Sequence, residues 1–189
     1  MSGELSTVGL AHRFISEVVC QGDICIDATA GRGRDTAFLC ELVGESGKVI
    51  AFDIQEDALA STYKLLEDKG IASRAELILD SHANIAKYAE PETVQGICFN
   101  FGWLPAGDHT IFTQAKSSIA AIEAGLRLLK IGGRMSLSIY YGRDCGFEER
   151  DALLEYLPTL DSKRYTVLIC DFANRPNNPP IPVMIIRDA

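Results

Sequence analysis

Residues 24–39, ICIDATAGRGRDTAFL, decide the fold of this 189-residue chain. The stretch passes from an apolar run into a loop with two glycines, Gly31 and Gly33, and then into residues with the apolar spacing of a helix. Glycine permits a tight turn and lets a ligand approach the backbone closely. A glycine pair after a strand and before a helix is typical of α/β domains that bind nucleotides.

Strands and helices alternate along the rest of the chain. The apolar patterns predict strands at 24–31, 48–54, 75–80, 94–101 and 134–141, and helices at 7–19, 34–44, 55–70, 111–133 and 147–157. Two last strands, 165–172 and 182–188, are joined by turn-forming residues and are expected to pair antiparallel. The sequence therefore predicts an α/β fold with a doubly wound, seven-stranded, mostly parallel sheet and a C-terminal antiparallel strand pair. This is the outline of class I methyltransferases.

The composition is that of a globular chain with a negative net charge. The formal charge of −8 argues against broad binding to nucleic-acid phosphate but leaves room for a local basic face. No apolar run approaches the roughly 20 residues of a membrane span, and the N-terminus lacks the pattern of a signal peptide. The six cysteines form no C-x-x-C pair, so we expect reduced thiols and no metal site. We expect one cytoplasmic domain over residues 1–189, without a membrane partner.

Polar side chains stand at the predicted carboxyl ends of the first five strands. They are Asp27, Asp53, Asp80, Asn100, Tyr140 and Tyr141. Ligands of doubly wound sheets bind beyond these ends, near the point where the strand order reverses. The three acids are therefore candidates for a binding site, and the alternative is that each only caps its own strand.

Two kinds of ligand suit the glycine loop. A dinucleotide needs its diphosphate held at the helix N-terminus, where Asp35 would repel it, and Thr36 stands where a third small residue is expected. S-adenosylmethionine carries no phosphate. Its ammonium suits Asp27, its ribose hydroxyls suit Asp53, and its adenine edge suits the third strand end. The acidic pocket favours S-adenosylmethionine, with a nicotinamide-dependent oxidoreductase as the alternative.

The end of the fourth strand is unusual, because Asn100 is followed by two large aromatic residues, Phe101 and Trp103. In amino-group methyltransferases an Asn or Asp at this strand end is followed, after two residues, by an aromatic. The amide carbonyl accepts a hydrogen from the amine and turns the nitrogen lone pair toward the methyl group, while the aromatic ring stacks on the base. Phe101 and Gly102 replace the usual two prolines between them. The alternative interpretation is that both aromatics belong to the core and that Asn100 caps a turn.

Five ordered blocks, DATAGRGRDTAFL, FDIQEDAL, LDSHANI, FNFGWLPAGDHT and IYYGRDCGFEER, and a closing NNPP resemble the YtqB/MnmM family of class I methyltransferases, once labelled rRNA methylases. The resemblance covers residues 10–187. It implies dependence on S-adenosylmethionine and methylation of the 5-aminomethyl group of the wobble uridine 34 of tRNA, giving 5-methylaminomethyl-2-thiouridine. The anticodon stem-loop of tRNA is then the expected partner.

The resemblance also implies a cofactor site. With the strand-end acids and the loop, its expected members are Asp27, Thr29, Gly31, Gly33, Asp35, Thr36, Asp53, Gln55, Asp80, Ser81, His82 and Asn100. The chain departs from the family pattern at Arg32, Trp103 and Ala106, where the family has Asn, Tyr and Gly. Trp103 keeps a stacking face but loses a phenolic hydroxyl, and Arg32 adds a positive charge near the pocket.

An aliphatic amine must lose its proton before the nitrogen can attack, and alignment then supplies much of the rate. Asn100 is expected to align the amine. Asp108, Tyr141 and His109 are the candidate proton acceptors, with Asp108 first, unless it only shapes the PAGD turn. The expected catalytic residues are therefore Asn100, Asp108 and Tyr141.

The wobble base is single-stranded, so it can be splayed out and stacked on an aromatic side chain. Phe101, Trp103 and Tyr141 are the stacking candidates. The candidates for phosphate contacts are Arg143, Arg175 and Lys116. Because the chain is acidic, we expect a small RNA footprint, and a homodimer would gather basic residues from two copies.

Several alternatives stay open at this point. The same cofactor site would suit an rRNA methyltransferase, a small-molecule amine methyltransferase or a cofactor-binding module without catalysis. His12 is interpreted as a partly buried helix histidine, and the NNPP segment as a stiff connector at the sheet edge.

Overall fold

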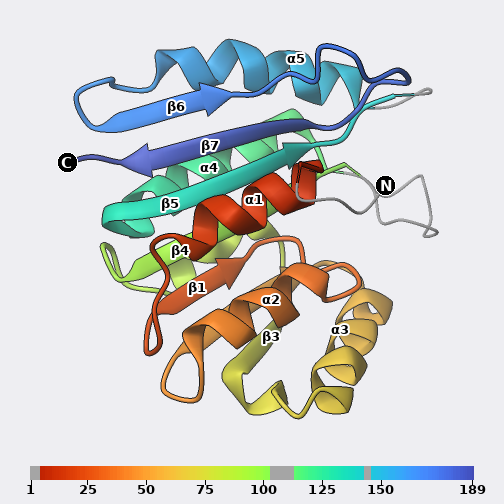
Figure 1. Ribbon diagram of the computed structural model, residues 1–189, viewed down its shortest axis with the longest axis vertical. Coiled ribbons are helices and arrows are strands. Elements are labelled where there is room, and N and C mark those ends of the chain that lie inside the picture. Colours follow the sequence, from red (N-terminus) through yellow and green to blue (C-terminus); the bar gives the residue numbers. More distant parts are fainter. Residues whose placement is uncertain (1–4, 103–112, 143–145) are drawn as a thin grey trace.

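The computed structural model describes residues 5–102, 113–142 and 146–189 (Figure 1). Its strands are β1 (Ile24–Asp27), β2 (Lys48–Asp53), β3 (Ala75–Leu79), β4 (Val94–Phe101), β5 (Leu129–Ile139), β6 (Tyr165–Ile169) and β7 (Ile181–Arg187). Its helices are α1 (Thr7–Ser16), α2 (Arg34–Val43), α3 (Glu56–Asp68), α4 (Ala115–Leu128) and α5 (Phe147–Tyr156). Short 3-10 turns form η1 (Ala72–Arg74), η2 (His82–Lys87) and η3 (Leu157–Thr159).

The seven strands form one sheet in the order β3-β2-β1-β4-β5-β7-β6. Strands β1 to β5 run parallel, and β7 pairs antiparallel with both β5 and β6. The predicted doubly wound α/β sheet with a C-terminal antiparallel pair is therefore confirmed. The strand order reverses between β1 and β4, so a ligand is expected beyond the carboxyl ends of these strands, on the right in Figure 1.

Helices cover both faces of the sheet. Helices α1, α2 and α3 pack on one face, around Cys25, Val49 and Cys98. The opposite face carries η2, α4 and α5, around Ile26 and Ile97. Neighbouring residues of one strand thus enter different cores, as the alternation of side chains along a strand requires. Figure 1 shows α1 and α2 in front of the sheet and α4 behind it. Within the described ranges, none of the helices has the length and hydropathy of a bilayer-spanning segment.

The predicted helix at residues 111–133 is wrong at its C-terminal end. Helix α4 stops one residue before Leu129, which is buried and begins β5. The register of β4 against β5 shifts between Val94 and Gly96, because extra residues of β5 form a bulge. Gly132 lies in the bulge with φ +78°, a conformation that favours glycine. Gly132 and Gly133 therefore belong to an irregular part of β5 and not to the end of α4. Helix α1 and strand β6 also end earlier than predicted, at residues 16 and 169.

Helix α1 is held against the sheet and the C-terminal segment. The side chain of Ser6 caps its first turn, accepting a backbone N–H at 3.0 Å. Thr7 Oγ1 donates to the carbonyl of Pro180 at 3.0 Å. From β5, Arg134 Nη1 donates to the carbonyl of Phe14 at 2.6 Å, and its guanidinium lies 4.6 Å from the Phe14 ring centroid. These contacts fix the helix next to the carboxyl ends of β1 and β4.

Candidate functional site

The glycine loop lies between β1 and α2 and turns through left-handed backbone. Gly31 has φ +54° and Gly33 has φ +77°. A Cβ at Gly33 would lie 2.8 Å from the Cα of Thr62 on α3, so the loop and α3 pack too closely for any side chain there. Thr62 Oγ1 also donates to the carbonyl of Gly31 at 3.3 Å. The two glycines therefore let the loop fold back onto α3.

Three backbone amides of this loop already have acceptors. The N–H of Thr29 donates to Asp27 Oδ1 at 3.2 Å, and that of Gly31 to Asp53 Oδ2 at 2.9 Å. The N–H of Gly33 donates to the carbonyl of Ala30 at 2.8 Å. A diphosphate needs such amides for itself and would meet two carboxylates instead. The geometry argues against a dinucleotide and suits a cationic ligand without phosphate.

Asp27 is completely buried at the end of β1. Besides the Thr29 amide, its carboxylate accepts from Thr36 Oγ1 at 2.6 Å. Burial, and then the nearby Asp35 carboxylate, raise the pKa of Asp27 to about 7. In the described structure Asp27 ties the loop to the first turn of α2, and its contact with a ligand stays a prediction.

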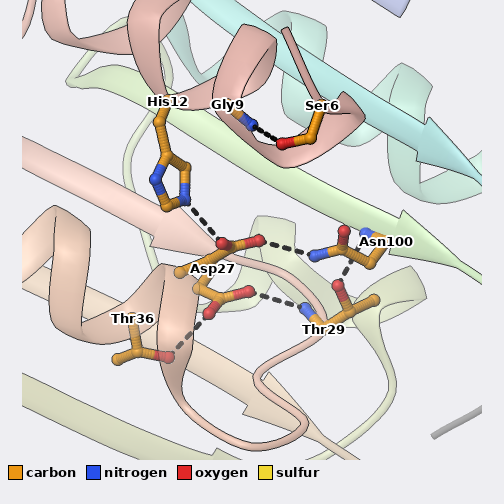
Figure 2. Close-up of polar contacts among 8 residues, drawn as sticks. Ser6, Gly9, His12, Asp27, Thr29, Thr36 and Asn100 are labelled. Carbon is orange, nitrogen blue, oxygen red and sulfur yellow. Dashed lines mark hydrogen bonds and ion pairs between the residues drawn. The ribbon is translucent and has the colours of Figure 1, made fainter. Parts of the chain in front are cut away.

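Asp35 joins α1 to β4. Its Oδ1 lies 2.7 Å from His12 Nε2, and its Oδ2 accepts from Asn100 Nδ2 at 2.7 Å. Figure 2 labels His12 and Asn100, and the dashed lines from their side chains mark these two contacts. Burial alone would raise the pKa of Asp35, but the two hydrogen bonds prevail and hold it below the ordinary value. Asp35 is therefore ionised at neutral pH.

Asn100 is held on two sides at the end of β4. Its backbone N–H donates to Thr29 Oγ1 at 2.7 Å, which links β4 to the glycine loop (Figure 2). An ionised carboxylate only accepts hydrogen bonds, so the amide nitrogen faces Asp35 and the carbonyl oxygen points away from it. The side chain is half-buried, so a ligand can reach it.

Asp53 stands at the end of β2, on the other side of the glycine loop. Its Oδ1 accepts from the N–H of Gln55 at 3.0 Å and its Oδ2 from Gly31, one bond on each oxygen. Each carboxylate oxygen has a further lone pair, so Asp53 can still accept from ligand hydroxyls. Ile54 is 56% exposed beside it and adds an apolar surface.

The third strand end is organised around Asp80. Its carboxylate accepts from the N–H of Ser81 and from Asn84 Nδ2, both at 2.7 Å, and from the Tyr88 hydroxyl at 2.9 Å. These bonds, led by the one from Asn84, lower the pKa of Asp80. Asp80 thus ties the end of β3 to residues of η2 and its C-cap, Tyr88, while Ser81 is the N-cap of η2, and a contact of Asp80 with a ligand stays a prediction.

His82 follows as a half-buried residue whose Nε2 atom is buried. Its Nε2 contacts no donor or acceptor in the part of the chain that the structure describes. Burial lowers the pKa of His82 to about 4, so the ring is neutral. It meets the rings of Phe99 and Phe101 edge-on, with centroids 6.4 and 6.0 Å away. A neutral ring with one unpaired nitrogen suits a heterocyclic ligand edge.

The substrate candidates divide into three groups. Phe101 is completely buried and stacks on Phe99 at 5.1 Å, so it belongs to the core and offers no stacking face. Tyr141 is half-buried under the Arg150 guanidinium, 4.7 Å from its ring centroid. Arg175 lies 3.7 Å over a ring of the C-terminal segment and donates to a backbone carbonyl at 2.9 Å. Lys116 is exposed on α4, and four candidates lie outside the described residues: Trp103, Asp108, His109 and Arg143.

A second buried acid near β4 has no counterpart in the sequence predictions. Glu149 on α5 is 4% exposed and accepts from Ser118 Oγ at 2.5 Å and from Thr113 Oγ1 at 2.6 Å. Thr113 Oγ1 in turn accepts from the N–H of Gly102 at 2.7 Å. Burial raises the pKa of Glu149 despite the two hydroxyl donors. We call Gly102, Thr113, Ser118 and Glu149 the α5 clasp. Its members are far apart in sequence, so no local pattern announces it.

The role of His12 was also missed by sequence reasoning. The residue lies on α1 and its partner on α2, and only the packing of the two helices brings them together. Its place on the sheet-facing side of an amphipathic helix is the one signal available in the sequence.

Comparison with known proteins places these features in a family. The model of the family described as "Putative rRNA methylase" matches residues 49–186. Among curated proteins, the chain is 32% identical to "tRNA (mnm(5)s(2)U34)-methyltransferase, chloroplastic" of Arabidopsis thaliana, across 98% of this chain and 71% of that protein.

Two solved structures are similar over nearly their whole length. A "putative rRNA-methylase" from Clostridium thermocellum is 44% identical with a TM-score of 0.94, covering 96% of this chain and 97% of the other. A "putative methyltransferase" from Streptococcus mutans, solved in complex with SAH (S-adenosylhomocysteine), is 39% identical with a TM-score of 0.88, covering 99% of both chains.

Proposed function

Since this chain belongs to the family described as "Putative rRNA methylase", we propose that it methylates the 5-aminomethyl group of 2-thiouridine at wobble position 34 of tRNA. The chain is an S-adenosylmethionine-dependent methyltransferase. The name of the Arabidopsis relative supports tRNA as the substrate. The product would be 5-methylaminomethyl-2-thiouridine.

One observation carries the proposal: the amide of Asn100 is fixed with its nitrogen on Asp35 and its carbonyl oxygen turned away from that carboxylate, at the reversal point of the sheet. A carbonyl oxygen accepts an N–H of an amine and so directs the nitrogen lone pair away from itself. Positioning of this kind suits transfer to nitrogen, because alignment supplies much of the rate once a methyl group is activated.

The residues around the glycine loop fit S-adenosylmethionine. The cofactor supplies a methyl group already activated on a sulfonium. We propose that Gly31 and Gly33 admit its amino-acid end near the acids and that Asp53 accepts from its ribose hydroxyls. Ser81 and the unpaired Nε2 of His82 would meet its adenine edge. Asp27 and Thr36 support the loop from behind.

The acceptor side includes residues outside the described part of the chain. We propose that Trp103 stacks on the wobble base and that Asp108 or Tyr141 takes the proton of the amine. Tyr141 keeps this place because it is half-buried at the end of β5, next to the reversal point. Phe101 is removed from the stacking role, since it is part of the core.

RNA contacts are expected to be few, because the chain carries a net charge of −8. Arg143 and Arg175 are the proposed phosphate contacts, and Arg175 is already held beside the C-terminal segment. We keep a homodimer, a single domain over residues 1–189 and a cytoplasmic location as parts of the proposal. The name of the Arabidopsis relative places that protein in the chloroplast.

The direct test is incubation with S-adenosylmethionine and tRNA from cells that lack the modification, followed by nucleoside mass spectrometry. We expect a mass increase of one methyl on 5-aminomethyl-2-thiouridine and no change with Asn100→Ala. Methyl groups on rRNA, or on free small amines but not on tRNA, would replace the proposed substrate with one of the alternatives.

A second measurement addresses the alternatives from other classes. S-adenosylhomocysteine is expected to raise the melting temperature, and NAD is expected to leave it unchanged, because the loop amides are engaged. A cofactor-binding module without catalysis would bind S-adenosylhomocysteine equally well and leave every RNA unmodified.

A further inference from the structure

A histidine from α1 closes a polar chain that reaches Asn100. His12 Nε2 lies 2.7 Å from Asp35 Oδ1, and Asp35 Oδ2 lies 2.7 Å from Asn100 Nδ2. We propose that His12 is a positioning residue for methyl transfer, which holds the Asp35 carboxylate so that this carboxylate sets the Asn100 amide. The inference rests on the proposed function for its consequence in catalysis, while the positioning itself can be measured without turnover.

The imidazole of His12 is fixed in orientation as well as in place. Its ring stacks on Phe38 with centroids 3.7 Å apart and an interplanar angle of 1°. Phe38 is three residues after Asp35 on α2, so both side chains lie on the same face of that helix. The stack therefore fixes the plane of the imidazole so that Nε2 faces the Asp35 carboxylate.

The ionisation of Asp35 determines which atom carries the hydrogen between His12 Nε2 and Asp35 Oδ1. The Asp35 carboxylate is ionised, so it only accepts, and Nε2 of His12 must carry the hydrogen. The other carboxylate oxygen then accepts from the Asn100 amide nitrogen. Because both oxygens are engaged by donors from different elements, the carboxylate has one orientation, and so has the amide.

The surroundings of Asp35 explain why the position needs this support. The neighbouring Asp27 carboxylate repels it, and Asp35 is only partly exposed, with 14% of its side chain open to solvent. Without the His12 donor, one oxygen of Asp35 would lose its hydrogen-bond partner with a like charge nearby. The carboxylate would then turn or take a proton, and a protonated carboxyl group no longer distinguishes the two ends of the Asn100 amide.

A purely structural role for His12, as packing between α1 and α2, makes a different prediction. Packing needs only the ring on Phe38, so His12→Phe would keep it. Positioning needs the hydrogen at Nε2, so His12→Gln, whose side-chain amide nitrogen can stand near that place, would keep most of it. Arg13→Gln changes an exposed residue of the same helix and serves as the control.

The experiment compares these three variants with the wild-type enzyme in two measurements. In single-turnover assays on hypomodified tRNA we expect a loss of about tenfold for His12→Phe, about threefold or less for His12→Gln, and no change for Arg13→Gln. The dissociation constant of S-adenosylhomocysteine should change by less than about threefold in all of them, since a positioning residue affects rate more than affinity. Equal losses for the Phe and Gln variants, or a rate loss that follows cofactor affinity, would overturn the proposal.

Nitrogen NMR gives a second test that does not depend on activity. We expect His12 to carry its hydrogen at Nε2 at neutral pH, and the Asn100 side-chain amide hydrogens to be protected from exchange. Loss of this protection in His12→Phe, but not in Arg13→Gln, would support the chain of contacts. An unprotonated Nε2 in the wild-type protein would refute it, even if the tRNA assay succeeds. If the tRNA assay fails and the NMR result holds, the substrate is wrong and the positioning stands.

Discussion

Two carboxylates, Asp35 and Glu149, lie near the end of β4 with little exposure to solvent, and they differ in their donors. Asp35, on the glycine-loop side, accepts from the imidazole of His12 and the amide of Asn100, whereas Glu149 in the α5 clasp accepts from two hydroxyls. The pKa of Asp35 is held below its ordinary value against burial, and burial raises that of Glu149. Burial alone therefore does not decide what an acid does. Asp35 is kept charged and orients a reactive corner, and Glu149 fastens three segments of chain.

The largest expected effect comes from removing the charge at Asp35. Asp35→Asn keeps the shape but sets an amide against the amide of Asn100, which is then free to turn. We expect single-turnover methyl transfer to fall about 100-fold, the size of effect that a misplaced reacting group produces. Glu149→Gln, the matched change in the α5 clasp, should lower the rate by less than about threefold. Equal losses in the two variants would show that Asp35 and Glu149 do not differ in their effect on methyl transfer.

The next effect concerns stability and the α5 clasp. Thr113→Val removes the hydroxyl that both Gly102 and Glu149 use, leaving a buried N–H and a buried carboxylate short of partners. We expect the free energy of unfolding to fall by about 1–3 kcal/mol. Thr113→Ser keeps the hydroxyl and is the control. Denaturant unfolding measures both, and a Ser variant as unstable as the Val variant would show that the Thr113 hydroxyl does not account for the stability of the α5 clasp.

A smaller effect is expected in the pH dependence of stability at Asp27. Its pKa is raised to about 7 in the folded protein from an ordinary value of 3.8, so the folded state holds more protons between these pH values. Its contribution to stability is thus fully present below pH 3.8 and is lost as pH rises toward about 7. Asp27→Asn should remove this decline, by up to about 1.4 kcal/mol for each pH unit.

Denaturant unfolding of wild type and Asp27→Asn at pH 5 and pH 8 gives the measurement. The difference in stability between the two proteins should change with pH in the variant's favour at the higher value. A constant difference would mean that Asp27 is ionised throughout, like Asp35, and that the two sides of the loop do not differ as described.

The smallest expected effect is at Asp80. Its carboxylate accepts three hydrogen bonds within its own turn, whereas each oxygen of Asp53 keeps a lone pair for a ligand. Asp80→Asn should change the dissociation constant of S-adenosylhomocysteine by less than about twofold, and Asp53→Asn should weaken it by about tenfold or more. Calorimetry measures both. A stronger effect at Asp80 would make it a direct ligand contact.

The sequence was most informative where neighbouring residues carry the signal. The apolar run, glycine loop and helix of residues 24–39 follow one another directly, so this strand, loop and helix could be predicted from them. Asn100 was found in the same way, because it ends an apolar strand. These features depend on backbone preferences and burial within a short segment.

The parts that could not be predicted depend on contacts between distant segments. His12 meets Asp35 because α1 packs beside α2, and Glu149 meets Thr113 across 36 residues. The end of α4 was misplaced because Gly132 serves a bulge that the pairing of β5 with β4 requires. A glycine in sequence does not say which neighbour imposes its conformation. Phe101 likewise has an aromatic side chain that could stack on a base. Its place in the alternation of side chains along β4 directs it into the core.

The central claim is that the glycine loop and Asn100 hold a phosphate-free cofactor and direct it toward an amine. A crystal structure with S-adenosylhomocysteine bound tests it most directly. The account predicts the ribose on Asp53 and the sulfur facing the side chain of Asn100. Binding elsewhere on the sheet, or a sulfur that faces away from Asn100, would contradict it.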